Sequence, residues 1–120
     1  MALVHHLYIG HFIPEQGYVR FQAHQPAVTH PIDVLAVRKL LRNYLGDNAS
    51  PSTLPDQWAM SILPDYIVCD HYGSPAAALQ FAADYARQEG ATIIDMGSFS
   101  LIPPEQLRSE AAVLRQAQPA

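Results

Sequence analysis

Residues 66–95 read YIVCDHYGSPAAALQFAADYARQEGATIID, and this stretch decides the fold that the sequence predicts. An apolar run at 66–70 is followed by Gly-Ser-Pro, an alanine-rich segment and a second apolar run at 91–95. Ser74 is a favourable N-cap, the proline after it suits the first helical position, and Gly90 suits the end of the helix. A helix between two continuously apolar strands is typical of a crossover between parallel strands, and we expect these two strands to be neighbours.

Further elements are predicted on both sides of this unit. Residues 2–13 favour a strand, PEQG suits a tight turn, and the alternating residues 18–23 favour a second strand, which predicts an antiparallel hairpin. Apolar residues at helical spacing predict helices over 31–45 and 103–118. Residues 58–63 could form one extra strand, separated from 66–70 by Pro64 and Asp65.

Together these patterns predict an α/β (α+β mixed) fold with a single-layer mixed sheet of about 4–5 strands. The sheet would contain the N-terminal hairpin and one βαβ crossover, with about three packed helices. The length of 120 residues fits a single globular domain over 1–120. Buried contacts should centre on Leu35, Leu41, Ile67, Val68, Phe81, Tyr85, Ile93 and Ile94.

Composition and charge narrow the classes of partner. Hydrophobic residues make up 49% of the chain and charged residues 15%, which favours a packed domain over a disordered segment. The formal net charge is −4. Nucleic-acid binders usually carry an extended basic patch, so nucleic acid is not expected as a partner. Arg38, Lys39 and Arg42 do cluster on the polar side of the first helix, where a solvated helix face is the simpler interpretation and a phosphate-binding patch is the alternative.

The single cysteine and the N-terminal segment bear on the compartment. Cys69 is the only cysteine, which favours a reducing environment. No Lys or Arg precedes Arg20, so a secretory signal is not expected. No stretch approaches the ~20 apolar residues of a membrane span. We therefore expect a soluble, cytoplasmic protein with no membrane partner.

Asp70 and Asp95 are the first candidate site residues. Each ends an apolar run, and each is followed within three residues by Gly-Ser, which brings in Ser74 and Ser98. In neighbouring parallel strands ~4.8 Å apart, the two carboxylates would meet at the edge where open α/β sheets bind ligands. They could then share a divalent cation, with His71 as a third ligand. The alternative is that these side chains only satisfy free backbone N–H groups in turns.

Other reactive side chains give weaker patterns. Cys69 and His71 lie two residues apart on an extended segment, with Cα atoms ~6.6 Å apart, so a thiolate–imidazole pair would need a bend in the chain. His5 and His6 point to opposite faces of a strand and should not chelate together. No paired-cysteine or His-Glu-x-x-His spacing is present, although a histidine site built across strands stays open.

Two functions follow from these observations. The first is a small acidic binding or interaction protein without catalysis or cofactor, which would bind or inhibit a basic protein partner and self-associate as a homodimer through its hairpin edge. Its binding candidates are Asp70, His71, Ser74, Asp95 and Ser98. The alternative is a metal-assisted hydrolase in which Asp70, His71 and Asp95 hold the ion. The missing nucleotide-binding and serine-nucleophile motifs favour the first.

Overall fold

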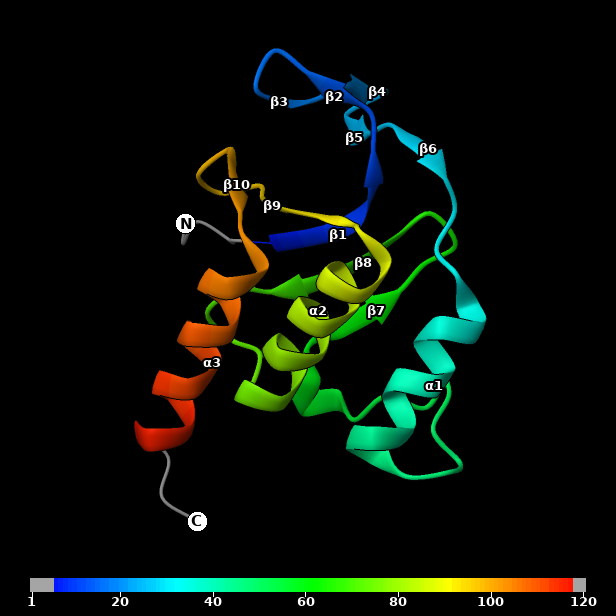
Figure 1. Cartoon of the computed structure of the whole chain (residues 1–120), viewed down its shortest axis with the longest axis vertical. Helices are drawn as coiled ribbons and strands as arrows, with labels where there is room; N and C mark the ends of the chain where they lie inside the picture. Colours follow the sequence, from blue (N-terminus) through cyan, green and yellow to red (C-terminus); the bar gives the residue numbers. More distant parts are fainter. Residues whose placement is uncertain (1–5, 118–120) are drawn as a thin grey trace.

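The computed structural model describes residues 6–117 as three α-helices on one face of a sheet, with two small hairpins at one end (Figure 1). The strand order of the sheet is β10-β9-β1-β8-β7, and β6 pairs with β1 as well. The strands of this sheet are β1 (His6–Phe12), β6 (Val28–His30), β7 (Met60–Ile62), β8 (Tyr66–Asp70), β9 (Thr92–Asp95) and β10 (Ser100–Ile102). The helices are α1 (Val34–Leu45), α2 (Ala76–Glu89) and α3 (Pro104–Ala117), with a 3-10 turn η1 (Asp56–Trp58) before β7. The predicted fold class is confirmed.

β1 is the central strand of the sheet. Tyr8 pairs with Val68 of β8 on one side and with Ile94 of β9 on the other, and both pairings are antiparallel. β8 and β9 therefore run in the same direction, and α2 connects them as predicted. The prediction that they are neighbours is wrong, because β1 lies between them. The pattern of residues 66–95 is local and does not indicate which distant strand pairs with its two strands.

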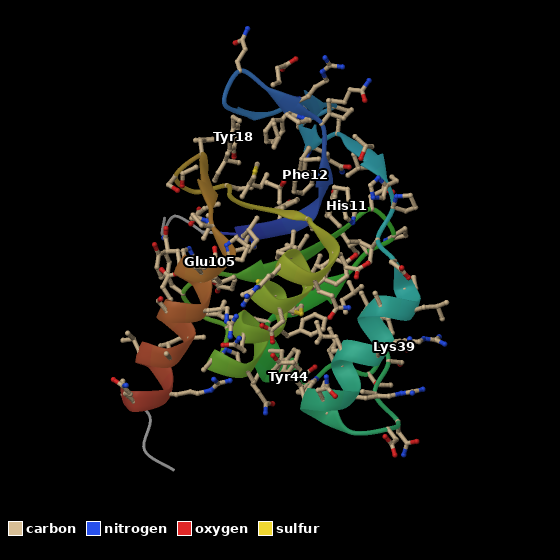
Figure 2. The ribbon with its side chains drawn as sticks, in the orientation of Figure 1. His11, Phe12, Tyr18, Lys39, Tyr44 and Glu105 are labelled. Carbon is tan, nitrogen blue, oxygen red and sulfur yellow. The ribbon has the colours of Figure 1, made fainter. Side chains whose placement is uncertain are left out.

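The two faces of the sheet differ in what covers them. Ile9, Ile67 and Ile93 point to one face, where they share a buried cluster with residues of α1, α2 and α3. Tyr8 and Ile94 point to the other face, because side chains alternate along a strand. That face is covered in part by Phe12 at the end of β1 and by Tyr18 in the segment that follows, both labelled in Figure 2. The helix-covered face holds the main core.

The caps of α1 and α2 differ from the prediction. Oδ1 of Asp33 accepts hydrogen bonds from the amides of Leu35 (3.0 Å) and Ala36 (3.2 Å), so α1 begins after Asp33 rather than at Pro31. Ser74 does not cap α2, because its hydroxyl donates to the carbonyl of Trp58 at 2.7 Å. Pro75 takes the cap position without a side-chain hydrogen bond. Gly90 ends α2 in the left-handed conformation, as expected.

The N-terminal hairpin is smaller than predicted. β2 (Pro14–Glu15) and β3 (Tyr18–Val19) form a two-residue hairpin around Gln16 and Gly17, whose φ angles are +49° and +81°. A second hairpin of β4 (Phe21–Gln22) and β5 (Gln25–Pro26) follows it. The long apolar strand β1 pairs with β8 and β9 instead of with residues 18–23, since burial in the sheet centre removes more apolar surface from water.

Most of the predicted core is buried. Leu41, Ile67, Phe81, Tyr85, Ile93 and Ile94 are each no more than 1% exposed. Val68 is half-buried on the partly covered face of the sheet, where it packs against the cluster of Phe12 and Ile94. Leu35 is 71% exposed, and its prediction as a core residue is wrong. The buried residues of α1 are Ala36, Val37, Leu40 and Leu41, and Leu35 lies on the opposite side of that helix.

Two short strands complete the sheet. Part of the segment 58–63 forms the strand β7, in which Met60 pairs with Cys69. Trp58, at the start of the segment, belongs to the 3-10 turn instead. β10 was not predicted, because a three-residue strand gives too short a pattern to be distinguished from a loop. No helix within residues 6–117 is both long enough and apolar enough to cross a lipid bilayer.

Candidate functional site

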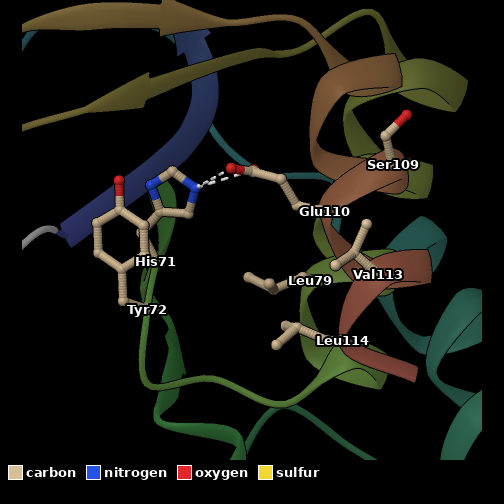
Figure 3. A pocket seen from close by; sticks show the side chains of 7 residues that line it. All are labelled: His71, Tyr72, Leu79, Ser109, Glu110, Val113 and Leu114. Carbon is tan, nitrogen blue, oxygen red and sulfur yellow. Dashed lines mark hydrogen bonds and ion pairs between the residues drawn. The ribbon is translucent and has the colours of Figure 1, made fainter. Parts of the chain in front are cut away.

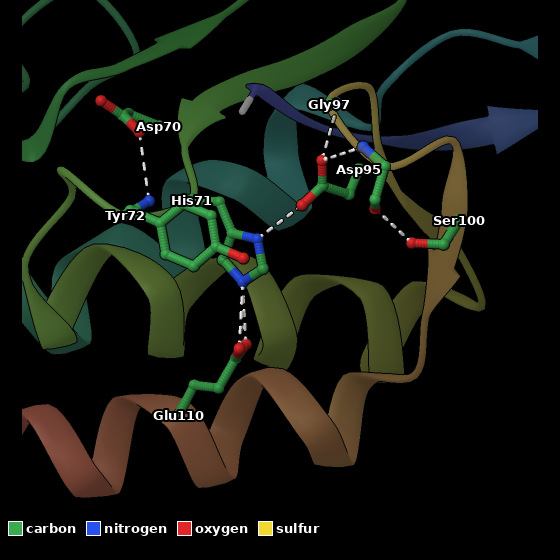
Figure 4. A network of polar contacts seen from close by, with 8 residues as sticks. Asp70, His71, Tyr72, Asp95, Gly97, Ser100 and Glu110 are labelled. Carbon is green, nitrogen blue, oxygen red and sulfur yellow. Dashed lines mark hydrogen bonds and ion pairs between the residues drawn. The ribbon is translucent and has the colours of Figure 1, made fainter. Parts of the chain in front are cut away.

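His71 lies between two carboxylates on the helix-covered face of the sheet (Figure 4). Its Nδ1 is 2.7 Å from Oδ2 of Asp95, and its Nε2 is 2.9 Å from Oε2 and 3.1 Å from Oε1 of Glu110. Carboxylates accept hydrogen bonds and do not donate them. Both ring nitrogens must therefore carry a proton for both contacts to be favourable, which describes an imidazolium between two anions.

Three elements bring these side chains together. Asp95 is the last residue of β9, where it pairs with Leu7 of β1 and faces the helices. His71 follows the last residue of β8 and points to the same face as Cys69. Glu110 lies on α3 next to Ala111, which is fully buried against the core. The contact thus ties the ends of two strands to a helix.

Burial and the neighbouring negative charges have opposite effects on the pKa of His71. The residue is only 5% exposed, and burial alone would lower its pKa. The hydrogen bonds and negative charges of Glu110 and Asp95 outweigh burial, so the pKa of His71 is raised above its ordinary value of 6.5. A raised pKa agrees with the geometry, in which each ring nitrogen faces a carboxylate.

Asp95 has further partners that hold it in place. Its Oδ1 accepts hydrogen bonds from the amides of Gly97 (2.7 Å) and Ser98 (3.2 Å) in the turn after β9. The carboxylate is only 2% exposed. A buried carboxylate with amide and imidazolium donors is well satisfied, so it fixes the His71 ring from one side.

A pocket of about 340 Å³ opens beside this contact (Figure 3). The residues that line it come from the turn after β8, from α2 and from α3: His71, Tyr72, Leu79, Ser109, Glu110, Val113 and Leu114. We call this space the α3 pocket. Its walls are mainly aliphatic and aromatic, and Figure 3 shows the carboxylate of Glu110 directed to the His71 end. Tyr72 and Val113 are exposed by 71% and 63%, so the pocket is open to solvent.

The structure separates the two aspartates that the sequence analysis paired. Asp70 pairs with His6 of β1 and lies on the face of Val68, whereas Asp95 lies on the opposite face with β1 between them. Oδ1 of Asp70 accepts from the amide of Tyr72 at 3.1 Å, so this carboxylate closes a turn. Within residues 6–117, no group of three or more His, Cys, Asp or Glu side chains is arranged to hold a metal ion.

The remaining predicted site residues have structural partners. The hydroxyl of Ser74 donates to the Trp58 carbonyl, and Oγ of Ser98 lies 2.6 Å from Oγ of Ser100. Cys69 is buried, and burial, with a smaller effect of the Asp70 charge, raises its pKa to about 12. A thiol held in its neutral form is a poor nucleophile, which removes the physical basis for a cysteine–histidine pair.

The histidines of the first strands form no chelating set among residues 6–117. The rings of His11 and His30 stack across β1 and β6 with centroids 3.9 Å apart. Burial, and then the charge of His30, lower the pKa of His11. His6 pairs with Asp70 on β8, and His5 lies outside the described residues, so the prediction about those two neighbours stays a prediction.

Glu110 is the charged site residue that sequence reasoning missed, and the pocket residues Leu79, Ser109, Val113 and Leu114 were missed with it. It is adjacent to the buried stripe of Leu107 and Ala111 on α3, which was the available signal that it lies near the core. That stripe does not show which strand end faces it. Comparisons with protein-family models, with curated proteins and with solved structures gave no match to this chain.

Proposed function

We propose that the protein is a non-catalytic binding protein whose α3 pocket takes a lysine or arginine side chain from a basic surface of a partner protein. The observation that carries this proposal is the combination of aliphatic walls with one carboxylate, that of Glu110, in the same open pocket. Lys and Arg have an aliphatic stem and a cationic end, so they match both parts of the pocket at once.

The charge of the site favours a cation. Asp95 and Glu110 carry two negative charges against one positive charge on His71, so the group is net negative when the imidazole is protonated. Glu110 is 35% exposed, and its oxygens keep acceptor capacity beyond the contact with His71. The ring of Tyr72 is exposed at the rim of the pocket and stacks on the His71 ring, with centroids 4.3 Å apart.

Several observations speak against catalysis at this site. Nε2 of His71 faces Glu110, whereas a general base for acyl transfer would face a nucleophile. Ser109 lines the pocket, but Figure 3 shows its hydroxyl directed away from the His71 ring. The metal-assisted alternative needed Asp70 and Asp95 together, and they lie on opposite faces of the sheet.

A titration followed by NMR tests the proposal directly. The probe is N-acetyl-lysine methylamide, and its control is the same molecule acetylated on Nζ, which keeps the stem and removes the charge. We expect saturable shifts at the amides of Tyr72, Glu110 and Val113 with the charged probe, and smaller shifts with the neutral one. Val113→Lys should weaken binding, because it places a like charge in the open part of the pocket.

A second substitution controls for the added charge of Val113→Lys. Ala112→Lys adds the same charge to an exposed position of α3 that does not line the pocket, and it should leave the titration unchanged. Equal binding of the neutral and charged probes would overturn the proposal, as would shifts that map outside the α3 pocket. Because Val113 is exposed, the variant should fold, and its amide spectrum would verify this.

A further inference from the structure

The outer face of α1 carries one apolar side chain followed by three cations. Leu35, Arg38, Lys39 and Arg42 stand at positions i, i+3, i+4 and i+7, so they share one face of the helix. All four are exposed, and Figure 2 labels Lys39 on this helix. We call these residues the basic stripe. In the part of the chain that the structure describes, none of the three cations has a carboxylate within 4.0 Å.

The basic stripe has the spacing of a helix that docks in a groove, with one apolar anchor and three cations in place of an apolar face. Anchors at i, i+3, i+4 and i+7 are the pattern by which amphipathic helices enter grooves on partner proteins. Leu35 is 71% exposed, and an apolar side chain of this kind gains from burial in an apolar pocket. The three cations would then lie near the rim, where a carboxylate is needed to pair with them.

The α3 pocket of the same protein offers both an apolar surface for Leu35 and a carboxylate for the cations of the basic stripe. Val113 and Tyr72 offer exposed apolar surface, and Glu110 offers the carboxylate. The stripe carries three positive charges in a chain of net charge −4, so the rest of the chain carries −7. Within one molecule the two surfaces do not meet, because α1 and α3 flank α2 on opposite sides (Figure 1).

We propose that the basic stripe of one copy of this chain docks in the α3 pocket of a second copy, with Leu35 against Val113 and the cations toward Glu110. This inference rests on the proposed function of the pocket and names its occupant. The contact joins two different surfaces, so each added copy leaves one stripe and one pocket free. Association is therefore head-to-tail, and the assembly grows with concentration beyond a dimer unless a ring closes.

Sedimentation velocity on the full chain over micromolar to near-millimolar concentration tests the association. We expect the average mass to rise above the monomer mass of 13.3 kDa with concentration, and to fall again in 1 M salt, where the Debye length is only about 3 Å. Arg38→Glu and Val113→Lys should each remain monomeric. Arg87→Glu makes the same change in net charge at an exposed position outside the stripe, and it should associate like the parent.

A mixture of the two monomeric variants gives the sharpest result. Arg38→Glu keeps an intact pocket and Val113→Lys keeps an intact stripe, so together they should form a 1:1 dimer and nothing larger. A monomer at every concentration would overturn the inference, and so would association that Arg38→Glu leaves unchanged. The lysine titration of the pocket is run on monomeric Arg38→Glu, so binding of the charged probe there would show that only the choice of occupant had failed. Loss of that binding would instead count against the proposed function itself.

Discussion

His71 Nδ1 and Asp95 Oδ2 are 2.7 Å apart, and this contact joins the ends of β8 and β9 across the intervening strand β1. Both side chains are almost fully buried. A buried charge pair of this kind contributes little when intact, yet it is expensive to break, because the remaining charge stays away from water. The effect of breaking this pair on the free energy of unfolding can therefore be measured independently of ligand binding.

Replacing His71 with leucine should destabilise the fold strongly. The change leaves Oδ2 of Asp95 buried without its imidazolium partner, which costs about 3–5 kcal/mol in comparable pairs. Urea unfolding followed by circular dichroism measures the difference. Asp70→Asn is the control, because its side-chain oxygen still accepts from the Tyr72 amide, and its effect should stay within about 0.5 kcal/mol. Similar losses in both variants would contradict the assignment of the buried pair.

The stability that His71 contributes should depend on pH in one direction. Its pKa is raised in the folded protein, because the bonds and charges of Glu110 and Asp95 outweigh burial. The contribution is therefore complete below pH 6.5, the ordinary value, and is lost as the pH rises through the raised pKa. His11 acts with the opposite sign, since its pKa is lowered and its contribution is lost as the pH falls.

Site-specific NMR titration separates the two histidines. The Cε1 resonance of His71 should titrate with a midpoint above 6.5, and Glu110→Gln should bring that midpoint down by removing one of the two charges. Glu105→Gln, on the exposed first turn of α3, should leave it unchanged (Figure 2). A midpoint at or below 6.5 in the parent protein would contradict the arrangement of His71 between two carboxylates.

Phe81 and Leu35 should respond very differently to truncation. Phe81 is fully buried, with its ring centroid 5.9 Å from that of Trp58 and 6.0 Å from that of Tyr44. Phe81→Ala should cost about 3–5 kcal/mol, because it removes a large side chain from the core and leaves a cavity. Leu35→Ala at the exposed position should change stability by less than about 0.5 kcal/mol. Thermal melts at a concentration where the protein is monomeric compare the two.

The N-cap of α1 can be tested by removing the capping oxygen of Asp33 and then restoring one. Asp33→Ala removes the oxygen that accepts from the amides of Leu35 and Ala36, and it should cost ~1 kcal/mol of unfolding free energy. Asp33→Ser restores a capping oxygen and should recover most of the loss. Chemical denaturation gives both values. No difference between the alanine and serine variants would show that the cap does not hold this end of the helix.

The elements of the fold were predictable where their signals are local. The strand at 66–70, the helix ending at Gly90 and the strand at 91–95 follow from apolar runs and turn residues that lie close together in the chain. The partners of these strands were not predictable in the same way. The insertion of β1 between β8 and β9 depends on contacts between residues about 60 to 90 positions apart, such as Leu7 with Asp95, which no local pattern encodes.

The candidate site shows the same limit. Asp95 and His71 were selected from the sequence because they follow apolar runs, and the structure does bring them together. Asp70 was selected by the same reasoning but points to the other face, because Leu7 of β1 pairs with both Cys69 and Asp95, so that Cys69 and not Asp70 is level with Asp95. Glu110 could not be selected, since a glutamate on an amphipathic helix is ordinary until the helix is placed against the sheet.

The central position of β1 also affects how the chain folds during synthesis. β1 leaves the ribosome long before β8 and β9, the strands that pair with its two edges. At about 5–20 residues per second, its apolar segment waits for several seconds without either partner. A nascent chain that ends before residue 92 lacks β9 altogether, so one edge of β1 remains open to other chains. Chaperone binding to the nascent chain should therefore persist until β9 has emerged.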